Sequence, residues 1–293
     1  MLVGPTASGK SAMALEAARR LGDVELVSAD SMQVYRGMDV GTAKPTPAEQ
    51  AEIPHHLLDL ADPGEDFSVA RFQAAATEAV AGIEARGRRA LVVGGTGLYV
   101  QAVVDGLALP GEWPALRAEL ETQPPEELHA RLVVLDPAAA SRIEPGNARR
   151  LVRALEVTLG SGRPFSSFGP GVGAYPATRF RLAGVWLPRW VLADRIAARY
   201  RDQVAAGFLD EVRRLQDEMS RTARQALGYK ELLDHLAGAC TLEEAVARAV
   251  ARPRELARRQ RAWFRRDPRI TWLGTSRNPV DLLPALLGDW SLP

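Results

Sequence analysis

The sequence is short of the features that define several protein classes. It has one cysteine, Cys240, and four histidines in 293 residues, which excludes an internal disulfide and does not support a structural zinc site. The longest uncharged stretches, such as residues 90–104, which contain Gly, Thr and Gln, are shorter than the roughly twenty apolar residues of a membrane-spanning helix. We therefore expect a reduced, cytoplasmic protein with no membrane segment and no signal peptide.

Lysine is also scarce. Of the 37 basic residues, only Lys10, Lys44 and Lys230 are lysines, and the other 34 are arginines. This excess of arginine is most simply explained by genome composition. Each remaining lysine is therefore a candidate for a specific role. The net charge of +1 conceals an uneven distribution, because residues 39–84 are mainly acidic whereas residues 248–269 hold nine arginines and two acids. An anionic partner is therefore expected near the C-terminal end.

The composition is otherwise that of a globular protein, with 46% hydrophobic and 25% charged residues. Its length predicts two domains, or one domain with a large insertion. The first third alternates short apolar runs with helical patterns, as strand–helix–strand units of a parallel sheet do. The expected strands are 2–3, 24–27, 56–60 and 90–93, and the expected helices are 10–21, 68–86 and 97–104.

From residue 109 to residue 178 the pattern changes to a stretch punctuated by proline, with helical fragments at 113–121, 125–134 and 147–159. We predict a small all-helical insertion domain there, between two parts of the core, 1–108 and 179–293. The second part is expected to hold a strand at 179–187, helices at 193–204, 208–218, 229–236 and 242–251, a break before Pro253, a basic helix to residue 266, and a strand at 270–273.

A phosphate-binding loop of the type found in nucleotide-binding and ATP-binding proteins follows the first strand and precedes a helix. The glycine at its turn lets successive N–H groups point into one concavity at the positive end of the helix dipole. The lysine supplies a mobile charge for a phosphate, and the last hydroxyl can bind Mg²⁺. The motif predicts a bound phosphate or pyrophosphate and an α/β fold, a P-loop NTPase-like parallel sheet flanked by helices. Its residues are Gly4, Pro5, Thr6, Ala7, Ser8, Gly9, Lys10 and Ser11.

Asp30 follows the second expected strand, at the carboxyl edge of the sheet where ligands of such folds bind. A carboxylate at this place could hold Mg²⁺ or accept a proton from a nucleophile. For an isolated aspartate, capping a turn or a helix is the alternative interpretation.

Several sequence blocks together resemble the tRNA dimethylallyltransferases, also called tRNA isopentenyltransferases. The blocks fall in the order of that family, cover nearly the whole chain, and contain or adjoin all three lysines. They are GPTASGKS at 4–11, SADSMQVYRGMDVGTAKP at 28–45, IPHHLLD at 53–59, FSVARF at 67–72, VGGTGLY at 93–99, RRLVRALEV at 149–157, QALGYKE at 225–231 and RELARRQRAWFRR at 254–266.

The resemblance implies a prenyltransferase of tRNA modification. It implies that dimethylallyl pyrophosphate donates its dimethylallyl group to the exocyclic amine of the adenine 3′ of the anticodon, and that pyrophosphate is released. Asp30 is then the base, with Thr96 and Arg117 as further catalytic residues. Arg199 joins the phosphate loop in binding the donor, and Mg²⁺ at Ser11 is the cofactor. The partners are dimethylallyl pyrophosphate and a tRNA anticodon stem-loop, and a monomer is expected.

Three segments match those that hold the tRNA in that family. An adenine stacked in a loop must be splayed out before a carboxylate in a cleft can reach it, and Ser31 and Gln33 are expected to read its edge. The segments are Asp30, Ser31, Met32 and Gln33; Arg149, Arg150, Leu151, Val152 and Arg153; and Gln225, Ala226, Leu227, Gly228, Tyr229 and Lys230.

Near the C-terminal end four arginines recur at helical spacing and form one basic stripe suited to phosphates, with a solvated basic face as the alternative interpretation. Apolar residues on the same helix, Leu256, Trp263 and Phe264, are expected to dock it on the core. The stripe consists of Arg254, Arg258, Arg261 and Arg265.

Two other functions share the phosphate loop. A small-molecule kinase would also have a parallel sheet and a helical lid, but it does not explain the block at 30–45 or the basic stripe. An RNA-binding switch driven by a nucleoside triphosphate needs a strand that ends in an aspartate for Mg²⁺. The best candidate strand, 90–93, ends in glycines instead.

Overall fold

A computed structural model describes residues 1–291 and divides the chain into two compact units. The first unit comprises residues 1–105 and the chain from Ala177 onward, and the second comprises Gly106–Pro176. The sequence places the insertion at 109–178, so each boundary lies within three residues of the expected one.

The first unit contains a parallel sheet, in which the described part of the chain places six strands in the order β3-β2-β4-β1-β5-β6. All strand pairs are parallel. This arrangement confirms the predicted fold class. The strands are β1 (Leu2–Val3), β2 (Val24–Ala29), β3 (His55–His56), β4 (Arg89–Gly94), β5 (Leu182–Trp186) and β6 (Ile270–Gly274).

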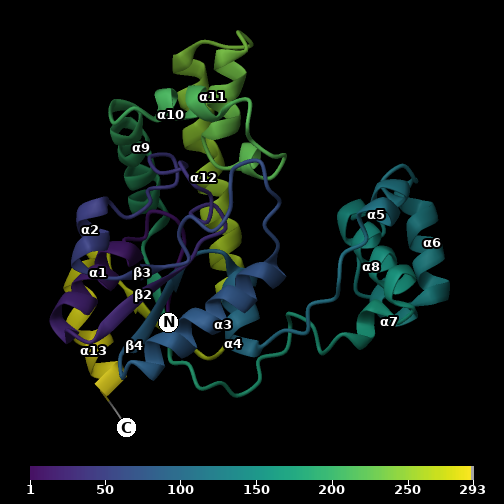
Figure 1. Cartoon of the computed structure of the whole chain (residues 1–293), viewed down its shortest axis with the longest axis horizontal. Helices are drawn as coiled ribbons and strands as arrows, with labels where there is room; N and C mark the ends of the chain where they lie inside the picture. Colours follow the sequence, from purple (N-terminus) through teal and green to yellow (C-terminus); the bar gives the residue numbers. More distant parts are fainter. Residues whose placement is uncertain (292–293) are drawn as a thin grey trace. The chain divides into compact units, whose positions relative to one another are not determined.

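Helices cover both faces of the sheet, because successive side chains of a buried parallel strand point to opposite faces. On β2, Val27 packs with α3 (Val69–Ala85) and α4 (Gly97–Asp105), whereas Leu26 packs with α1 (Lys10–Leu21). The described part of α13 (Leu283–Ser291) lies on the α1 side (Figure 1). The core of the first unit therefore has a layer on each side of the sheet.

A third apolar cluster lies apart from the sheet and joins four helices to the loop that follows β2. Its loop residues include Val34, Tyr35 and Met38, which are fully buried. The cluster holds the segment that carries Asp30 against the second half of the core. Its helices are α9 (Arg189–Ala205), α10 (Phe208–Leu215), α11 (Tyr229–Leu236) and α12 (Leu242–Phe264).

The predicted break before Pro253 is wrong, because α12 is continuous through that residue. Proline cannot donate the hydrogen bond expected inside a helix, at a cost of about 3 kcal/mol. A buried stripe that includes Ala249, Pro253, Ala257 and Phe264 packs the helix on its neighbours. That packing outweighs the lost bond and keeps both halves in one element.

Other differences concern element ends. The strand expected at 56–60 ends at His56, because Leu57 and Asp59 adopt positive φ angles of 65° and 55° that an extended strand does not allow. Helix α9 begins at Arg189, four residues earlier than expected. The sequence interpretation missed α2 (Pro47–Glu52), although Thr46 and Glu49 form a capping box there, and it also missed α13.

The second unit is all-helical, as predicted, with its own apolar core. The carboxylate of Glu156, whose side chain has no exposed surface, accepts hydrogen bonds from Arg117, Arg153 and the backbone N–H of Trp113 at 2.8–3.1 Å. This carboxylate therefore joins α8 (Ala148–Ser161) to α5 (Pro114–Leu120) and its N-cap. The other elements are α6 (Pro125–Leu135), α7 (Pro137–Ala140) and the 3-10 helix η1 (Phe165–Ser167).

Glu156→Gln should weaken the second unit and should do so in a pH-dependent way. Burial would raise the pKa of Glu156, but the bonds from Arg117, Trp113 and Arg153 outweigh it and hold the pKa below its ordinary value of 4.5. A depressed pKa contributes stability that is complete above pH 4.5 and is lost as pH falls. Because both arginines are about one-third exposed, we expect a loss of about 2 kcal/mol at neutral pH, below the 3–5 kcal/mol of fully buried pairs.

Hydrogen exchange of the α8 amides measures this free energy without requiring the whole chain to unfold in one step. The exposed Glu119, on α5, provides the control variant Glu119→Gln. The difference between Glu156→Gln and the unchanged protein should shrink below pH 4.5. A difference that is constant with pH would contradict the charge-assisted role of Glu156.

Candidate active site

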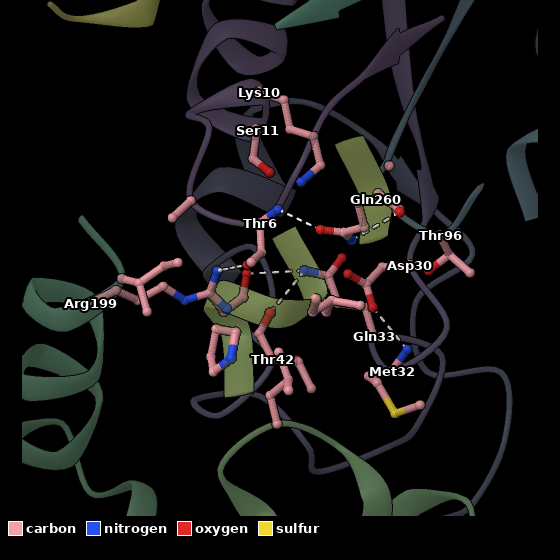
Figure 2. Close-up of a pocket in the computed structure, with 18 of the residues that line it drawn as sticks. Thr6, Lys10, Ser11, Asp30, Met32, Gln33, Thr42, Thr96, Arg199 and Gln260 are labelled. Atoms are coloured by element: carbon pink, nitrogen blue, oxygen red, sulfur yellow. Dashed lines mark hydrogen bonds between the residues drawn. The ribbon is translucent and has the colours of Figure 1, made fainter. Parts of the chain in front are cut away.

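The phosphate loop links β1 to α1, as predicted, and two of its residues have a left-handed backbone. Ala7 has φ 60° and Gly9 has φ 83°. A Cβ at Gly9 would also lie 2.7 Å from Pro279 Cγ, so only glycine fits there. The loop lines a cleft of about 760 Å³ through Thr6, Ala7, Gly9, Lys10 and Ser11 (Figure 2).

Lys10 lies in this cleft with little compensation for its charge. Its Nζ is 3.4 Å from the carbonyl oxygen of Pro5. Burial lowers the pKa of Lys10 to about 8; the nearby Asp30 acts to raise the pKa and Arg199 acts to lower it. Lys10 is thus a buried cation that an anionic ligand would stabilise.

Two arginines on one face of α9, Arg195 and Arg199, line the same cleft. The Nη1 of Arg199 is 3.5 Å from Thr6 Oγ1, and burial lowers the pKa of this arginine. Within residues 1–291, Arg199 Nε and Arg195 Nη1 are buried with no hydrogen-bond partner. Together with Lys10 they form a positively charged wall that can hold a diphosphate.

Asp30 and Thr96 meet at the carboxyl ends of β2 and β4, opposite the phosphate loop (Figure 2). Asp30 Oδ1 accepts a hydrogen bond of 2.8 Å from the backbone N–H of Met32, which fixes the orientation of the carboxylate. Thr96 Oγ1 accepts a 3.2 Å bond from the backbone N–H of Ser31. Thr96 therefore ties the Asp30 turn to β4 through this side-chain bond.

Gln260 of α12 is a site residue that the sequence interpretation missed. Its Oε1 accepts a 2.8 Å bond from the N–H of Thr6, and its Nε2 donates a 2.9 Å bond to the carbonyl of Gly95. It therefore bridges the phosphate loop and the turn that carries Thr96. A Cβ at Gly95 would lie 2.6 Å from Gln260, and one at Gly97 would lie 2.4 Å from Trp263, so these glycines allow α12 to approach.

The loop between Asp30 and α2 has no regular structure and is held by a buried carboxylate from α10. Glu211 accepts bonds of 2.7–3.0 Å from three successive N–H groups, those of Asp39, Val40 and Gly41. It also accepts a 2.5 Å bond from the hydroxyl of Tyr229. Burial raises the pKa of this hydroxyl. The loop is thus a rigid wall of the cleft.

Gln33, expected to read the adenine edge, is largely engaged inside the protein. Its Nε2 donates to the carbonyls of Thr42 and Ala43 at 3.3 and 3.1 Å, and its Oε1 accepts a 2.8 Å bond from Ser28. Gln33 can therefore offer a ligand only the remaining acceptor capacity of its Oε1. Its orientation depends on the loop that Glu211 holds.

Lys44 has a structural position. Its side chain is 3% exposed, and its Nζ lies 2.6 Å from a carboxylate oxygen of Asp39 and of Asp59 and 2.8 Å from the carbonyl of Tyr35. A compact ammonium satisfies these three acceptors in three directions. Lys230, in contrast, is exposed.

The segment 225–230 divides into residues that face the cleft and residues that do not. Ala226 and Leu227 line the cleft. Gly228 is buried, and Tyr229, expected to contact tRNA, has no exposed surface and bonds to Glu211 instead. The expectation for the Tyr229 side chain is therefore corrected: it supports the loop. Gln225 and Lys230 are exposed.

The remaining predicted site residues lie in the second unit. Arg149 and Arg150 are exposed, whereas the Leu151 and Val152 side chains are buried in the core of that unit. For these two side chains the expected RNA contact is corrected, since Leu151 has no exposed surface and Val152 is only 5% exposed. Arg117 and Arg153 are partly exposed and pair with Glu156 as described above.

Comparison with known proteins places the chain in a family. A family model described as IPP transferase matches residues 33–267, and another, described as isopentenyl transferase, matches residues 1–60. The chain belongs to the IPP transferase family. This membership confirms the resemblance seen in the sequence blocks.

Several named proteins are similar in sequence to this IPP transferase family member over most of its length. A protein of Streptomyces coelicolor named tRNA dimethylallyltransferase is 50% identical over 280 residues, 93% of this chain and 88% of that protein. A tRNA isopentenylpyrophosphate transferase of known structure from Bacillus halodurans is 39% identical, with a TM-score of 0.70 over 98% of this chain and 95% of its own. A eukaryotic dimethylallyltransferase described as acting on tRNA is 27% identical, with a TM-score of 0.78 over 93% and 72% of the two chains.

Binding of pyrophosphate to this family member should weaken as pH rises through the pKa of Lys10. Lys10 is charged below pH 8 and becomes neutral above it, so the association constant should fall about fivefold between pH 8 and pH 9 beyond any change intrinsic to the ligand. Calorimetric titration of Lys10→Met should show weaker binding and no such additional fall. Lys230→Met, at an exposed lysine, is the matched control. Parallel pH profiles for the unchanged protein and Lys10→Met would contradict the role of Lys10.

Proposed function

We propose that this protein is a tRNA dimethylallyltransferase. It transfers the dimethylallyl group of dimethylallyl pyrophosphate to the exocyclic amine of the adenine 3′ of the anticodon in tRNA and releases pyrophosphate. The observation that carries the proposal is the shared cleft, in which Asp30 lies across from the phosphate loop, Lys10 and Arg199. The names of the relatives from Streptomyces coelicolor and Bacillus halodurans support it.

The donor gives up its leaving group at the phosphate loop. The bond between the allylic carbon and the pyrophosphate oxygen breaks, and the electron pair stays on the oxygen. Lys10 and Arg199 line the cleft where this negative charge develops, and Arg195 adds a further cation whose Nη1 is buried. Because these groups are already in place, they favour departure without ATP hydrolysis.

The acceptor amine is activated by Asp30. The lone pair of the exocyclic amine is delocalised into the adenine ring, which makes the amine a poor nucleophile. As its nitrogen bonds to the allylic carbon, it must lose a proton. Asp30 Oδ1 is held by the N–H of Met32, and the same carboxylate orients the amine and accepts that proton.

Magnesium is the proposed cofactor. Ser11 lies on the cleft beside Lys10, and within residues 1–291 no three His, Cys, Asp or Glu side chains gather as a metal-binding group. This set fits a Mg²⁺ ion that takes most of its ligands from phosphate oxygens and water and one from Ser11, the usual manner of Mg²⁺ in proteins. When bound, the ion supplies further neutralisation of the pyrophosphate charge.

The tRNA and donor bind within one chain. All residues that line the cleft belong to the first unit, and we propose that the enzyme is a monomer. No helix within residues 1–291 is both long and apolar enough to cross a membrane. Action on tRNA accords with a cytoplasmic enzyme.

A direct assay tests the activity against its two rivals. Dimethylallyl pyrophosphate labelled in its carbon chain is incubated with unmodified tRNA and Mg²⁺, and label should enter the RNA. The same tRNA with another base in place of the adenine 3′ of the anticodon is the control and should remain unlabelled. Conversion of ATP to ADP without label in RNA would favour the kinase or the RNA-binding switch instead.

Asp30→Asn should abolish most turnover while leaving both substrates bound. The asparagine oxygen can still accept the bond from the N–H of Met32, so the turn survives, whereas the proton acceptor is lost. We expect kcat to fall by about 10²–10⁴ with little change in the dissociation constants for pyrophosphate and tRNA. Asp217→Asn, at an exposed site, is the control. Turnover close to that of the unchanged enzyme would remove Asp30 as the base.

A further inference from the structure

A second groove of about 460 Å³ lies between the N-terminal half of α9 and the C-terminal half of α12. All four members of the basic stripe line this groove, and Arg189 of α9 joins them. The groove shares only Ile196 with the catalytic cleft. It is therefore a separate surface, and no step of the proposed reaction uses it.

The groove and the catalytic cleft lie on opposite sides of α12. Residues 253, 256, 260 and 263 line the cleft, whereas residues 254, 258, 261 and 265 line the groove. At 100° per residue, the mean directions of these two sets differ by roughly 150°. A nucleotide in the cleft therefore cannot touch the stripe, and whatever binds the stripe does so away from the reacting adenine.

The five arginines of the groove have no acidic partners within residues 1–291. The acids nearest to the basic stripe in sequence are engaged elsewhere, since Glu255 pairs with Arg259 and Asp267 pairs with Arg269. Burial is the main cause that lowers the pKa of Arg261, and the positive charges of Arg265 and Arg189 lower it further. The positive charges of the groove therefore lie close to one another. Such a cluster favours an anionic ligand from outside the protein.

The shape of the cluster favours a polyanion. From 254 to 265 the stripe extends about 16 Å along α12, so a single diphosphate could meet only part of it. The Trp190 side chain on the groove is 65% exposed and offers a flat ring on which a base can stack. Arginines in a row beside an exposed aromatic ring suit a nucleic-acid backbone.

We propose that the α9–α12 groove binds a stretch of the sugar–phosphate backbone of the substrate tRNA, outside the anticodon stem-loop that enters the cleft. This inference rests on the proposed function for the identity of the RNA. The groove supplies affinity that does not depend on the base sequence. The cleft supplies selection of the adenine.

The test compares full-length tRNA with the isolated anticodon stem-loop in equilibrium binding without donor. The triple variant Arg258→Gln/Arg261→Gln/Arg265→Gln is matched by Arg201→Gln/Arg214→Gln/Arg277→Gln, three exposed arginines that do not line the groove. The groove variant should bind full-length tRNA at least about tenfold more weakly at 0.1 M salt. Its plot of log affinity against log salt should be less steep by about two. Its affinity for the stem-loop should be unchanged.

Retained pyrophosphate affinity verifies that the groove variant is folded, and the single variants Arg258→Glu and Arg265→Glu, both at exposed residues, provide a second series. Full-length tRNA affinity equal to that of the control variant would overturn the proposal, as would equal losses for tRNA and stem-loop. Binding of anionic lipid vesicles that falls in the groove variant while tRNA binding does not would assign the groove to a membrane surface instead. Because binding is measured without donor, failure of the transferase assay would not produce any of these results.

Discussion

Positive charge buried without matching acids is the constraint on which the cleft depends. Burial lowers the pKa of both Lys10 and Arg199, whereas the negative charge of Asp30 acts to raise both pKa values. Arg195 and Arg199 each leave a buried nitrogen without a hydrogen-bond partner within residues 1–291. A buried charge without a partner lowers the free energy of unfolding. An anion that binds only the folded protein raises it again. Binding of the leaving group and stability of the fold are therefore linked through the same three side chains.

The groups that face this charge are fixed by distant parts of the chain. Gln260 joins the phosphate loop to the Thr96 turn, and Glu211 holds the loop that continues from Asp30. Both supports come from helices of the second half of the core, whereas the residues that they hold come from the first half. A site arranged in this way needs little reorganisation when charge develops during the reaction.

Local signals made much of this structure predictable. The phosphate loop, the helices expected at 68–86 and 147–159, and the alternation of strands and helices are read from neighbouring residues. The missed features depend on contacts across the chain. Gln260 lies 254 residues from Thr6, and the helix through Pro253 depends on tertiary packing. Nothing near Arg117 in sequence indicates Glu156, which lies 39 residues away. The four-residue spacing of Arg195 and Arg199 was a usable signal for a shared face.

The scarcity of lysine has a chemical consequence at the catalytic cleft. A primary amine reacts with acylating agents in its neutral form, and its neutral fraction at mildly alkaline pH depends on its pKa. Lys44 is shielded by two carboxylates and is 3% exposed, and Lys230 is on the surface, whereas Lys10 has a pKa of about 8. At mildly alkaline pH the Lys10 amine is therefore largely neutral, and it lies in the cleft proposed to bind the pyrophosphate. An electrophile attached to a pyrophosphate mimic would therefore react covalently with the neutral Lys10 amine.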